Sequence, residues 1–378
     1  MYTYKTLYLN LTNQCNLACK YCYVQQASTK MPLGVALDAI DFLFSQNVNE
    51  KKKAICFFGG EPLLLWDEVL IPSIAYSKRK YKEYNTKFIF TTNGTLLNQE
   101  KIDTIKEYGI KLVLSIDGTP ETQNYNRTFT NGDPTYPIVA NNLKLLYNNN
   151  CKYTIKSVIY SQTSNNFYNN ILHLAPYCTE HILFMPDFLH PWSESEKNIF
   201  FSEIKKVSNY YLDSWKNETP QVKLRDFDRL IKKHHNLQQN KINTSKLEYL
   251  CQCGTPNDHH FAVSPNGNIY TCQDIANYEE ETPFHIGNIY TGFDLEKQLK
   301  LYTYLQNNKK IGDMSCKDCS AYAFCKDNCI IKNYILNQNA VQCSTFQCEY
   351  NRYMYEISKQ MYEVLRNNSF YIDYLNIK

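Results

Sequence analysis

Residues 13–23 read NQCNLACKYCY, and in this stretch Cys15, Cys19 and Cys22 have the spacing C-x3-C-x2-C. Thiolates are soft ligands suited to iron–sulfur clusters and to zinc. Three thiolates fill only three corners of a four-iron cube, so the fourth iron keeps a position for a substrate or cofactor. Residues 6–12 read as a strand because they are rich in β-branched and aromatic side chains. The cysteines would then follow the C-terminal end of a first strand, where barrel enzymes place their chemistry.

This arrangement resembles the signature of the radical S-adenosylmethionine (SAM) superfamily, C-x3-C-x-aromatic-C, with Tyr21 at the aromatic position. The resemblance implies a 4Fe–4S cluster on Cys15, Cys19 and Cys22 with SAM bound to the open iron. It also implies cleavage of SAM to methionine and a 5′-deoxyadenosyl radical, which removes a hydrogen atom from an unactivated position. From the triplet alone, the alternative is a zinc site whose fourth ligand lies elsewhere.

Length and composition indicate a globular protein with two domains. The chain has 378 residues and a mass of 44.4 kDa, more than one hydrophobic core usually serves. Its net charge of +3 gives no indication of a nucleic-acid partner. No apolar run is long enough to span a membrane, and the first residues lead into a strand rather than a signal peptide. The 15 cysteines therefore favour cluster or metal ligation in a reducing cytoplasm over disulfides.

Short apolar runs alternate with amphipathic stretches from residue 6 to about residue 186. The predicted strands are 7–11, 54–58, 87–91, 111–115, 153–159 and 181–185, and the predicted helical stretches are 32–47, 64–82, 98–108, 136–149 and 166–176. Six strand–helix units argue for an α/β fold with a parallel sheet. This pattern does not distinguish a barrel from a doubly wound sheet. The resemblance implies a partial (β/α)6 TIM barrel over residues 1–190.

Several motifs that follow the predicted strands match the superfamily pattern. Glycines let the backbone approach a ligand closely, and an acid such as Glu61 can accept hydrogen bonds from an ammonium group. The resemblance implies that Glu61 receives the SAM amino group, that Arg127 pairs with the SAM carboxylate and that Phe188 lies near the adenine. The predicted cofactor-binding residues are Tyr21, Gly59, Gly60, Glu61, Asn93, Ser115, Asp117, Arg127 and Phe188. For each motif the alternative is an ordinary turn or a solvated loop.

Residues 191–250 carry no ligand pattern, and we predict that they form a helical connector. Ser193 and Glu196 make a capping box ahead of an apolar-periodic helix that runs to about Trp215. A second, basic helical stretch covers residues 222–240. Because its adjacent His234 and His235 cannot share one helix face, we interpret this stretch as a solvated surface rather than a metal site.

A second cysteine pattern occupies the C-terminal part of the chain. It reads C-x13-G-x4-C from Cys253 to Cys272, and later C-x2-C-x5-C-x3-C from Cys316 to Cys329. Residues 262–270 between the first two cysteines read as a β-hairpin with an Asn-Gly turn. The pattern is similar to the SPASM extension of radical SAM enzymes, so residues 251–378 are predicted to form a SPASM domain with a C-terminal helix. Structural zinc sites are the alternative.

The resemblance implies two auxiliary 4Fe–4S clusters, which makes three clusters in all. The ligands would be Cys253, Cys272 and Cys329 for cluster I, and Cys316, Cys319, Cys325 and Cys348 for cluster II. We prefer Cys348 to Cys343 because it opens the final helix. Either Cys251 completes cluster I, or a substrate thiolate binds its open iron. The unassigned residues, which we interpret as small buried hydrophobes, are Cys56, Cys151 and Cys178.

SPASM members mostly modify residues within peptides or proteins, so the resemblance implies a radical SAM oxidoreductase with a peptide or protein substrate. Our first hypothesis is a maturase of a ribosomally made peptide (a RiPP) that forms a thioether or other crosslink. Leader binding would fall to a separate protein or another surface, since no recognition domain precedes the barrel. An external electron donor such as flavodoxin or ferredoxin would supply electrons.

The alternative hypothesis is an anaerobic sulfatase-maturating enzyme, which oxidises Cys or Ser to formylglycine. Such enzymes place an aspartate base directly after the G-x4-C cysteine. Here Gln273 stands at that position and Asp274, the predicted catalytic residue, comes one later. A third class, a non-catalytic zinc-binding interaction protein, predicts zinc without iron.

Overall fold

A computed structural model describes residues 4–217, 222–239, 259–276, 282–307, 319–322, 324–325 and 329–376. The chain divides into two compact units. Unit 1 comprises Met1–Ser115, Thr128–Lys152 and Gln252–Asn308, and unit 2 comprises Ile116–Arg127, Tyr153–Cys251 and Lys309–Lys378. Each unit thus combines part of the predicted barrel with part of the cysteine-rich region. The domain boundaries inferred from the motifs stay a prediction.

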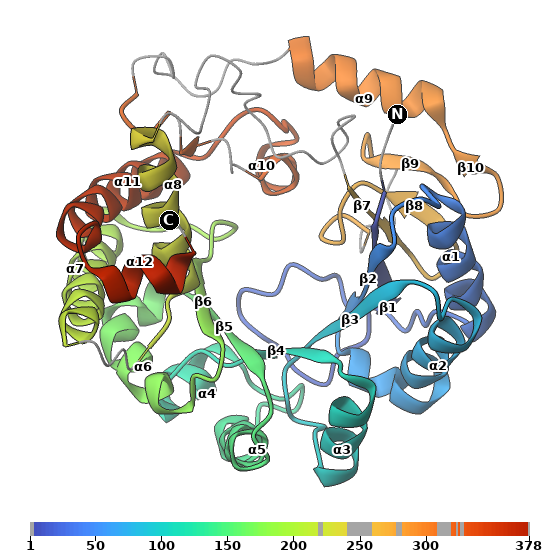
Figure 1. Cartoon of the computed structure of the whole chain (residues 1–378), viewed down its shortest axis with the longest axis horizontal. Helices are drawn as coiled ribbons and strands as arrows, with labels where there is room; N and C mark the ends of the chain where they lie inside the picture. The colour runs from blue at the N-terminus through green and yellow to red at the C-terminus, as the bar shows by residue number, and fades with distance from the viewer. Residues whose placement is uncertain are drawn as a thin grey trace. The chain divides into compact units, whose positions relative to one another are not determined.

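Unit 1 is built on one sheet with strand order β10-β9-β8-β7-β1-β2-β3-β4 (Figure 1). Its strands are β1 (Thr6–Thr12), β2 (Lys52–Gly59), β3 (Asn85–Thr92), β4 (Lys111–Ser115), β7 (His260–Val263), β8 (Asn268–Tyr270), β9 (His285–Asn288) and β10 (Gly292–Phe293). Strands β1 to β4 are parallel, as predicted. Strand β7 also pairs in parallel with β1, so that Leu7 faces both Ile55 and Phe261. The hairpin of the cysteine-rich region therefore extends the same sheet.

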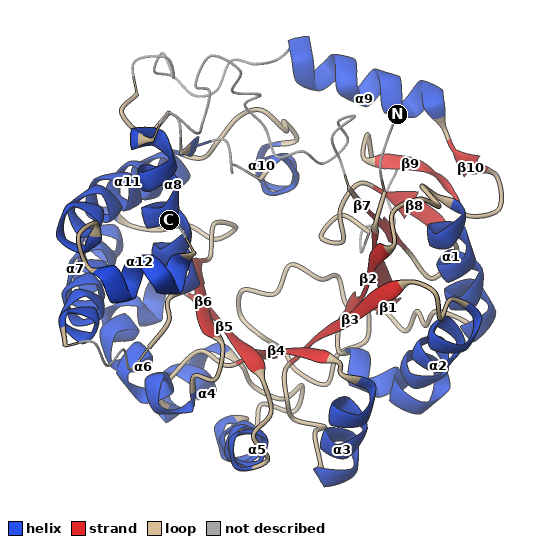
Figure 2. Ribbon diagram, in the orientation of Figure 1, coloured by secondary structure: helices blue, strands red, loops and turns tan. Residues whose placement is uncertain are grey.

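The sheet of unit 1 is covered on one side by helices (Figure 2). The helical elements of this unit are α1 (Leu33–Ser45), the short helices Pro62–Leu65 and Trp66–Leu70, α2 (Ile71–Lys80), α3 (Gln99–Tyr108), α5 (Tyr136–Asn148) and α9 (Leu295–Asn307). Local sequence sets their ends: the Asn98 side chain accepts a hydrogen bond from the Lys101 N–H at 2.9 Å, and Gly109 closes α3 with φ 64°. The core consists of apolar residues such as Leu7 and Leu9, both completely buried.

Unit 2 contains two parallel strands and a group of long helices. Its elements are α4 (Pro120–Asn126), β5 (Tyr153–Ile159), the short helix Ser161–Asn166, α6 (Phe167–Leu174), the short helix Ala175–Tyr177, β6 (His181–Pro186), α7 (Glu194–Lys216), α8 (Arg225–Gln238), α10 (Ile330–Asn337), α11 (Thr345–Leu365) and α12 (Ser369–Leu375). The capping box of Ser193 and Glu196 is confirmed at the start of α7. Phe184 of β6 packs against Phe167 and Phe227, which joins this strand to α6 and α8.

The structure corrects two expectations about buried groups. His234 is not on a solvated surface: it is buried against α11, and its Nε2 lies 3.0 Å from Ser358 Oγ. The stretch 222–240 reads as polar in sequence because only one side of α8 packs inward. Cys178 is half-buried rather than buried, whereas Cys56 and Cys151 are buried as expected. Among the described residues, no helix is long and apolar enough to cross a membrane.

Candidate active site

The cysteine loop follows β1 in unit 1 and is held by the loop that follows β2. The Gly60 N–H donates to the Thr12 carbonyl at 2.7 Å, and the Glu61 N–H donates to the Gln14 carbonyl at 2.8 Å. Because β1 and β2 are parallel neighbours, both loops leave the same edge of the sheet. The Gly-Gly-Glu motif therefore fixes the backbone that carries Cys15.

Glycine is required at both positions of this motif. A Cβ atom on Gly60 would lie 2.0 Å from the Gln14 carbonyl oxygen, and one on Gly59 would lie 2.3 Å from that of Thr12. The backbone of Gly59 also has φ +136°, a conformation that residues with a side chain rarely adopt. The glycines thus allow two backbone segments to touch, which is a more specific role than that of an ordinary turn.

The sulfur of Cys15 faces hydrogen-bond donors. The Leu17 N–H lies 3.4 Å from Cys15 Sγ, and Asn93 Nδ2 lies 3.8 Å from the same atom. Burial raises the pKa of Cys15 to about 11, so its thiolate form needs a positive charge such as iron beside it. Cys19 is half-buried and Cys22 is exposed. Three thiols on one short loop, with two N–H donors directed at the sulfur of Cys15, are a donor set that fits an iron–sulfur cluster.

Asn93 connects the end of β3 to the cysteine loop. Its Nδ2 donates to Asn16 Oδ1 at 2.9 Å, and its Oδ1 accepts hydrogen bonds from the backbone and hydroxyl of Thr95. Asn16 Nδ2 in turn donates to Thr95 Oγ1 at 2.8 Å. This ring of polar contacts orients the residue next to Cys15, which is the kind of support that positions a metal ligand.

Glu61 is 1% exposed and is bonded to the chain itself. Its carboxylate accepts hydrogen bonds from the Leu63 N–H at 3.0 Å, the Thr92 hydroxyl at 2.7 Å and the Asn93 N–H at 2.8 Å. Burial raises its pKa to about 7, against the opposing effect of these donors. A carboxylate has about four lone-pair positions, so one position is left for an ammonium group of a ligand.

Ser115 ends β4 in unit 1 and is buried, as is Tyr21 between the first cysteines. In unit 2, Arg127 Nη2 forms a buried ion pair with Asp117 Oδ1 at 3.1 Å. Asp117 also accepts hydrogen bonds from Asn126 Nδ2 and from the Val158 N–H. Asp117 therefore holds the Arg127 guanidinium in place. Contact of either residue with SAM stays a prediction.

Tyr23, which the sequence patterns did not single out, lies beside the predicted base Asp274. Tyr23 donates its hydroxyl hydrogen to Asp274 Oδ1 at 3.0 Å, and both residues belong to unit 1. Burial raises the pKa of Tyr23 well above its usual value, so the phenol keeps its proton. Tyr23 directly follows Cys22, and this adjacency is the signal that could have identified it. Asp274 is thereby attached to the cysteine loop.

The C-terminal cysteines lie in both units. In unit 1 the Cys272 thiol donates to Gln273 Oε1 at 3.6 Å. In unit 2 Cys329 precedes α10, Cys348 lies in the first turn of α11, and Asn351 Nδ2 lies 3.5 Å from Cys325 Sγ. The predicted ligands outside the described residues are Cys251, Cys253 and Cys316. Across the part of the chain that the structure describes, no disulfide forms. In the same part, no group of three or more His, Cys, Asp or Glu side chains is arranged so that it could hold a single metal ion.

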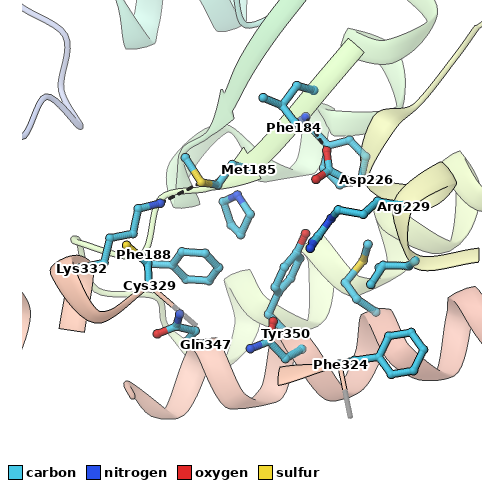
Figure 3. A pocket seen from close by; sticks show the side chains of 15 residues that line it. Phe184, Met185, Phe188, Asp226, Arg229, Phe324, Cys329, Lys332, Gln347 and Tyr350 are labelled. Carbon is cyan, nitrogen blue, oxygen red and sulfur yellow. Dashed lines mark hydrogen bonds between the residues drawn. The ribbon is translucent and has the colours of Figure 1, made fainter. Parts of the chain in front are cut away.

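Phe188 lines a cavity of about 210 Å³ in unit 2 (Figure 3). Lys332 reaches into it, with its Nζ 2.8 Å from Met185 Sδ and 5.5 Å from the centre of the Phe188 ring. Asp226 also lines the cavity and accepts a hydrogen bond from the Phe184 N–H at 3.0 Å. Burial raises the pKa of Asp226 to about 6. The cavity thus combines aromatic walls with charged groups, and the expected proximity of Phe188 to adenine stays a prediction.

Comparison with known proteins identifies similar sequences. The family model for the Radical SAM superfamily matches residues 9–166. The uncharacterised protein MJ0907 of Methanocaldococcus jannaschii is 30% identical, over 71% of this chain and 84% of that protein. A cysteine-type anaerobic sulfatase-maturating enzyme of Clostridium novyi is 23% identical, over 84% and 85%. The radical SAM cyclopropyl synthase TigE of Paramaledivibacter caminithermalis is 22% identical, over 86% and 68%.

Solved structures extend the similarity to nearly the whole chain. Hexahistidine-tagged anSMEcpe with bound AdoMet has a TM-score of 0.78 at 20% identity, over 99% of this chain and 97% of that chain. Native anSMEcpe with bound AdoMet and the Cp18Cys peptide has a TM-score of 0.74 at 20% identity, over 98% of each. At this identity the likeness shows a common fold.

Proposed function

Because this chain belongs to the radical SAM superfamily, we propose that it oxidises a cysteine residue of a peptide or protein substrate, with formylglycine as the favoured product. Membership of this family implies SAM and one 4Fe–4S cluster as cofactors, and it identifies the protein as an enzyme. The likeness to anSMEcpe confirms the radical SAM α/β fold. The choice of product is the part that we infer.

The hydrogen bond between Tyr23 and Asp274 is the observation that carries the proposal. In sequence, Asp274 is one position later than the base of sulfatase-maturating enzymes, and this shift favours the thioether hypothesis. In the fold, Tyr23 attaches the Asp274 carboxylate to the cysteine loop. A carboxylate held beside the cysteine loop supports the reaction that needs a base for a thiol proton.

The chain's own residues have separate roles in this proposal. The residues that would hold the cluster are Cys15, Cys19 and Cys22, and Glu61 would accept the SAM ammonium group. When bound, SAM and the cluster supply the radical that takes one hydrogen atom from the substrate Cβ. Asp274 accepts the substrate thiol proton, one electron leaves the substrate, and a carbon–sulfur double bond forms. Water then converts this thioaldehyde to formylglycine and releases hydrogen sulfide.

The electron that leaves the substrate needs an acceptor. We propose auxiliary 4Fe–4S clusters bound by the C-terminal cysteines, with an external donor such as flavodoxin or ferredoxin supplying electrons for SAM cleavage. The amide of Asn351, which is directed at Cys325 Sγ, supports a cluster in unit 2. Such oxygen-sensitive chemistry would suit a reducing cytoplasm.

A peptide thioether maturase is the second candidate, and Gln273 favours it. An amide, which is no base, stands where sulfatase-maturating enzymes have aspartate, and its Oε1 lies 3.6 Å from Cys272 Sγ. In this reaction the substrate sulfur bonds to a carbon radical of the same peptide, with loss of one proton and one electron. Leader recognition would then involve a separate protein or another surface.

One experiment separates the two products. The reconstituted protein is incubated without oxygen with SAM, dithionite and a peptide that carries cysteine in a sulfatase-like context. We expect 5′-deoxyadenosine together with an aldehyde that a hydrazide reagent captures. A peptide that has lost two hydrogens without an aldehyde would favour the thioether. Equal 5′-deoxyadenosine formation after alanine replaces Cys15, Cys19 and Cys22 would overturn both.

A further inference from the structure

The cavity in unit 2 (Figure 3) contains Lys332, a cation that has only weak partners among the described residues. Its Nζ lies 2.8 Å from Met185 Sδ and 5.5 Å from the centre of the Phe188 ring. A thioether is a weak hydrogen-bond acceptor, and an aromatic ring attracts a cation only through its quadrupole. Both partners are weaker than a carboxylate, so the ammonium group keeps most of its capacity to bind an anion.

Gln347 brings an unused hydrogen-bond acceptor to the same cavity. This residue is 4% exposed, and its Oε1 atom accepts no hydrogen bond from any other described residue. A buried polar atom without a partner destabilises a protein, and such atoms are therefore rare. A ligand with an N–H or O–H group next to its anionic group would supply the missing donor.

Two helices begin at the cavity and make one side of it positive. Lys332 lies in the first turn of α10, and Gln347 lies in the first turn of α11. The start of a helix carries a partial positive charge and favours a nearby anion. Asp226 and Arg229 lie on the side opposite Lys332 and offset each other in charge (Figure 3). An anion would therefore bind on the side of Lys332 and Gln347.

We propose that this cavity is a recognition subsite for an acidic group of the peptide substrate. This inference rests on the proposed function, from which it takes a peptide as the substrate. A carboxylate of the peptide, from an acidic side chain or from the C-terminus, pairs with the Lys332 ammonium group. The main-chain N–H beside that carboxylate donates to Gln347 Oε1.

The walls and size of the cavity suit one side chain of a peptide. The rings of Phe188 and Tyr350, with their centres 5.6 Å apart, form an aromatic wall for the apolar stem of an acidic residue. The cavity volume of about 210 Å³ is smaller than that of the usual pocket for a whole small-molecule ligand. A single residue of a longer chain is the better fit.

Peptide binding to the reconstituted enzyme tests the proposal, measured by fluorescence anisotropy with SAM and without reductant. The probes are short labelled peptides with one cysteine and one glutamate, in which the glutamate occupies each other position in turn. Matched peptides carry glutamine instead, and every peptide is made with a C-terminal carboxylate and with a C-terminal amide. We expect glutamate at one position, or the free C-terminus, to strengthen binding by about 10–100-fold. These two arms distinguish the sources of the carboxylate.

Variants of the two cavity residues assign the effect. Lys332→Met should abolish the gain in affinity, Lys332→Arg should keep most of it, and the exposed Lys359→Met of α11 should bind like the wild type. Gln347→Leu should bind the peptide more weakly, but its melting temperature without peptide should be unchanged or higher because a buried unpaired atom is removed. A purely structural role of Gln347 would lower that melting temperature instead.

The inference is wrong if no carboxylate strengthens binding, or if Lys332→Met keeps the gain. Weaker SAM binding or a lower iron content in Lys332→Met would also overturn it, because Lys332 would then act on the nucleotide or on a cluster. Product analysis of the same peptides after addition of reductant separates this inference from the proposed function. A gain in affinity that depends on Lys332, without any aldehyde product, would reject formylglycine formation and keep the subsite.

Discussion

Tyr23 and Asp274 are joined by a hydrogen bond of 3.0 Å although 251 positions separate them in the sequence. The register of the sheet explains this contact. Strand β7 pairs in parallel with β1, so the hairpin that leads to Asp274 runs beside the strand that leads to the cysteine loop. The predicted base is therefore held by unit 1 itself.

Replacement of Asp274 by asparagine should uncouple SAM cleavage from product formation. Asparagine keeps the size and can still bond to Tyr23, but it cannot accept a proton. We expect product formation to fall by about 10²–10⁴-fold, the usual contribution of a general base. Formation of 5′-deoxyadenosine should continue, as chromatography would measure. The matched control is Asp103→Asn, which changes an exposed carboxylate of α3. If Asp274→Asn reduced 5′-deoxyadenosine and the modified peptide by the same factor, a role of Asp274 as the base would be contradicted.

Alanine at Gly60 should weaken the SAM cluster, whereas alanine at Gly34 should not. The added methyl group at Gly60 would collide with the Gln14 carbonyl at 2.0 Å, but at Gly34 nothing lies within 4 Å. We therefore expect Gly60→Ala to displace the cysteine loop and reduce iron retention during gel filtration. Gly34→Ala lies in α1 and should be neutral or stabilising by about 0.5–1 kcal/mol. Normal iron retention in Gly60→Ala would show that the loop adapts.

Lys53→Met should destabilise unit 1. The buried Nζ atom donates to the Gln46 carbonyl at 2.6 Å and to the Tyr4 and Asn47 carbonyls at 3.3 Å each. Methionine fills similar space but leaves these acceptors without their donor, at a cost of about 1–3 kcal/mol. Urea unfolding would measure the change, with the neighbouring exposed Lys52→Met as the control. A free energy of unfolding equal to that of the control would refute this role.

Acidification should destabilise the protein through His234. Burial lowers its pKa from 6.5 to about 4, so between these values the unfolded chain binds a proton that the folded chain does not. The contribution to stability is complete above pH 6.5 and decreases as the pH falls towards 4. In thermal unfolding at pH 7 and pH 5, His234→Gln should lose less stability than the wild type. The adjacent His235→Gln should behave like the wild type; an identical pH response of all three would exclude His234 as the cause.

Local patterns in the sequence were enough to predict many of the strands and helices and the position of the cysteine loop. The strands at 111–115 and 153–159 have the predicted bounds, and the capping box and the Asn-Gly hairpin form as expected. These features depend on residues close together in the chain, so periodicity and turn chemistry suffice to predict them. The placement of Cys15, Cys19 and Cys22 after β1 follows from the same reasoning.

Residue types and their spacing were sufficient to predict the α/β class, and they predict which residues would bind iron and SAM. The tertiary structure alone shows that the end of β3 donates hydrogen bonds to Glu61, that His234 is buried, and that Asp274 accepts a hydrogen bond from Tyr23. Each of these contacts joins segments that lie far apart in the chain. Their formation depends on sheet register and helix packing, which no local pattern of residues records.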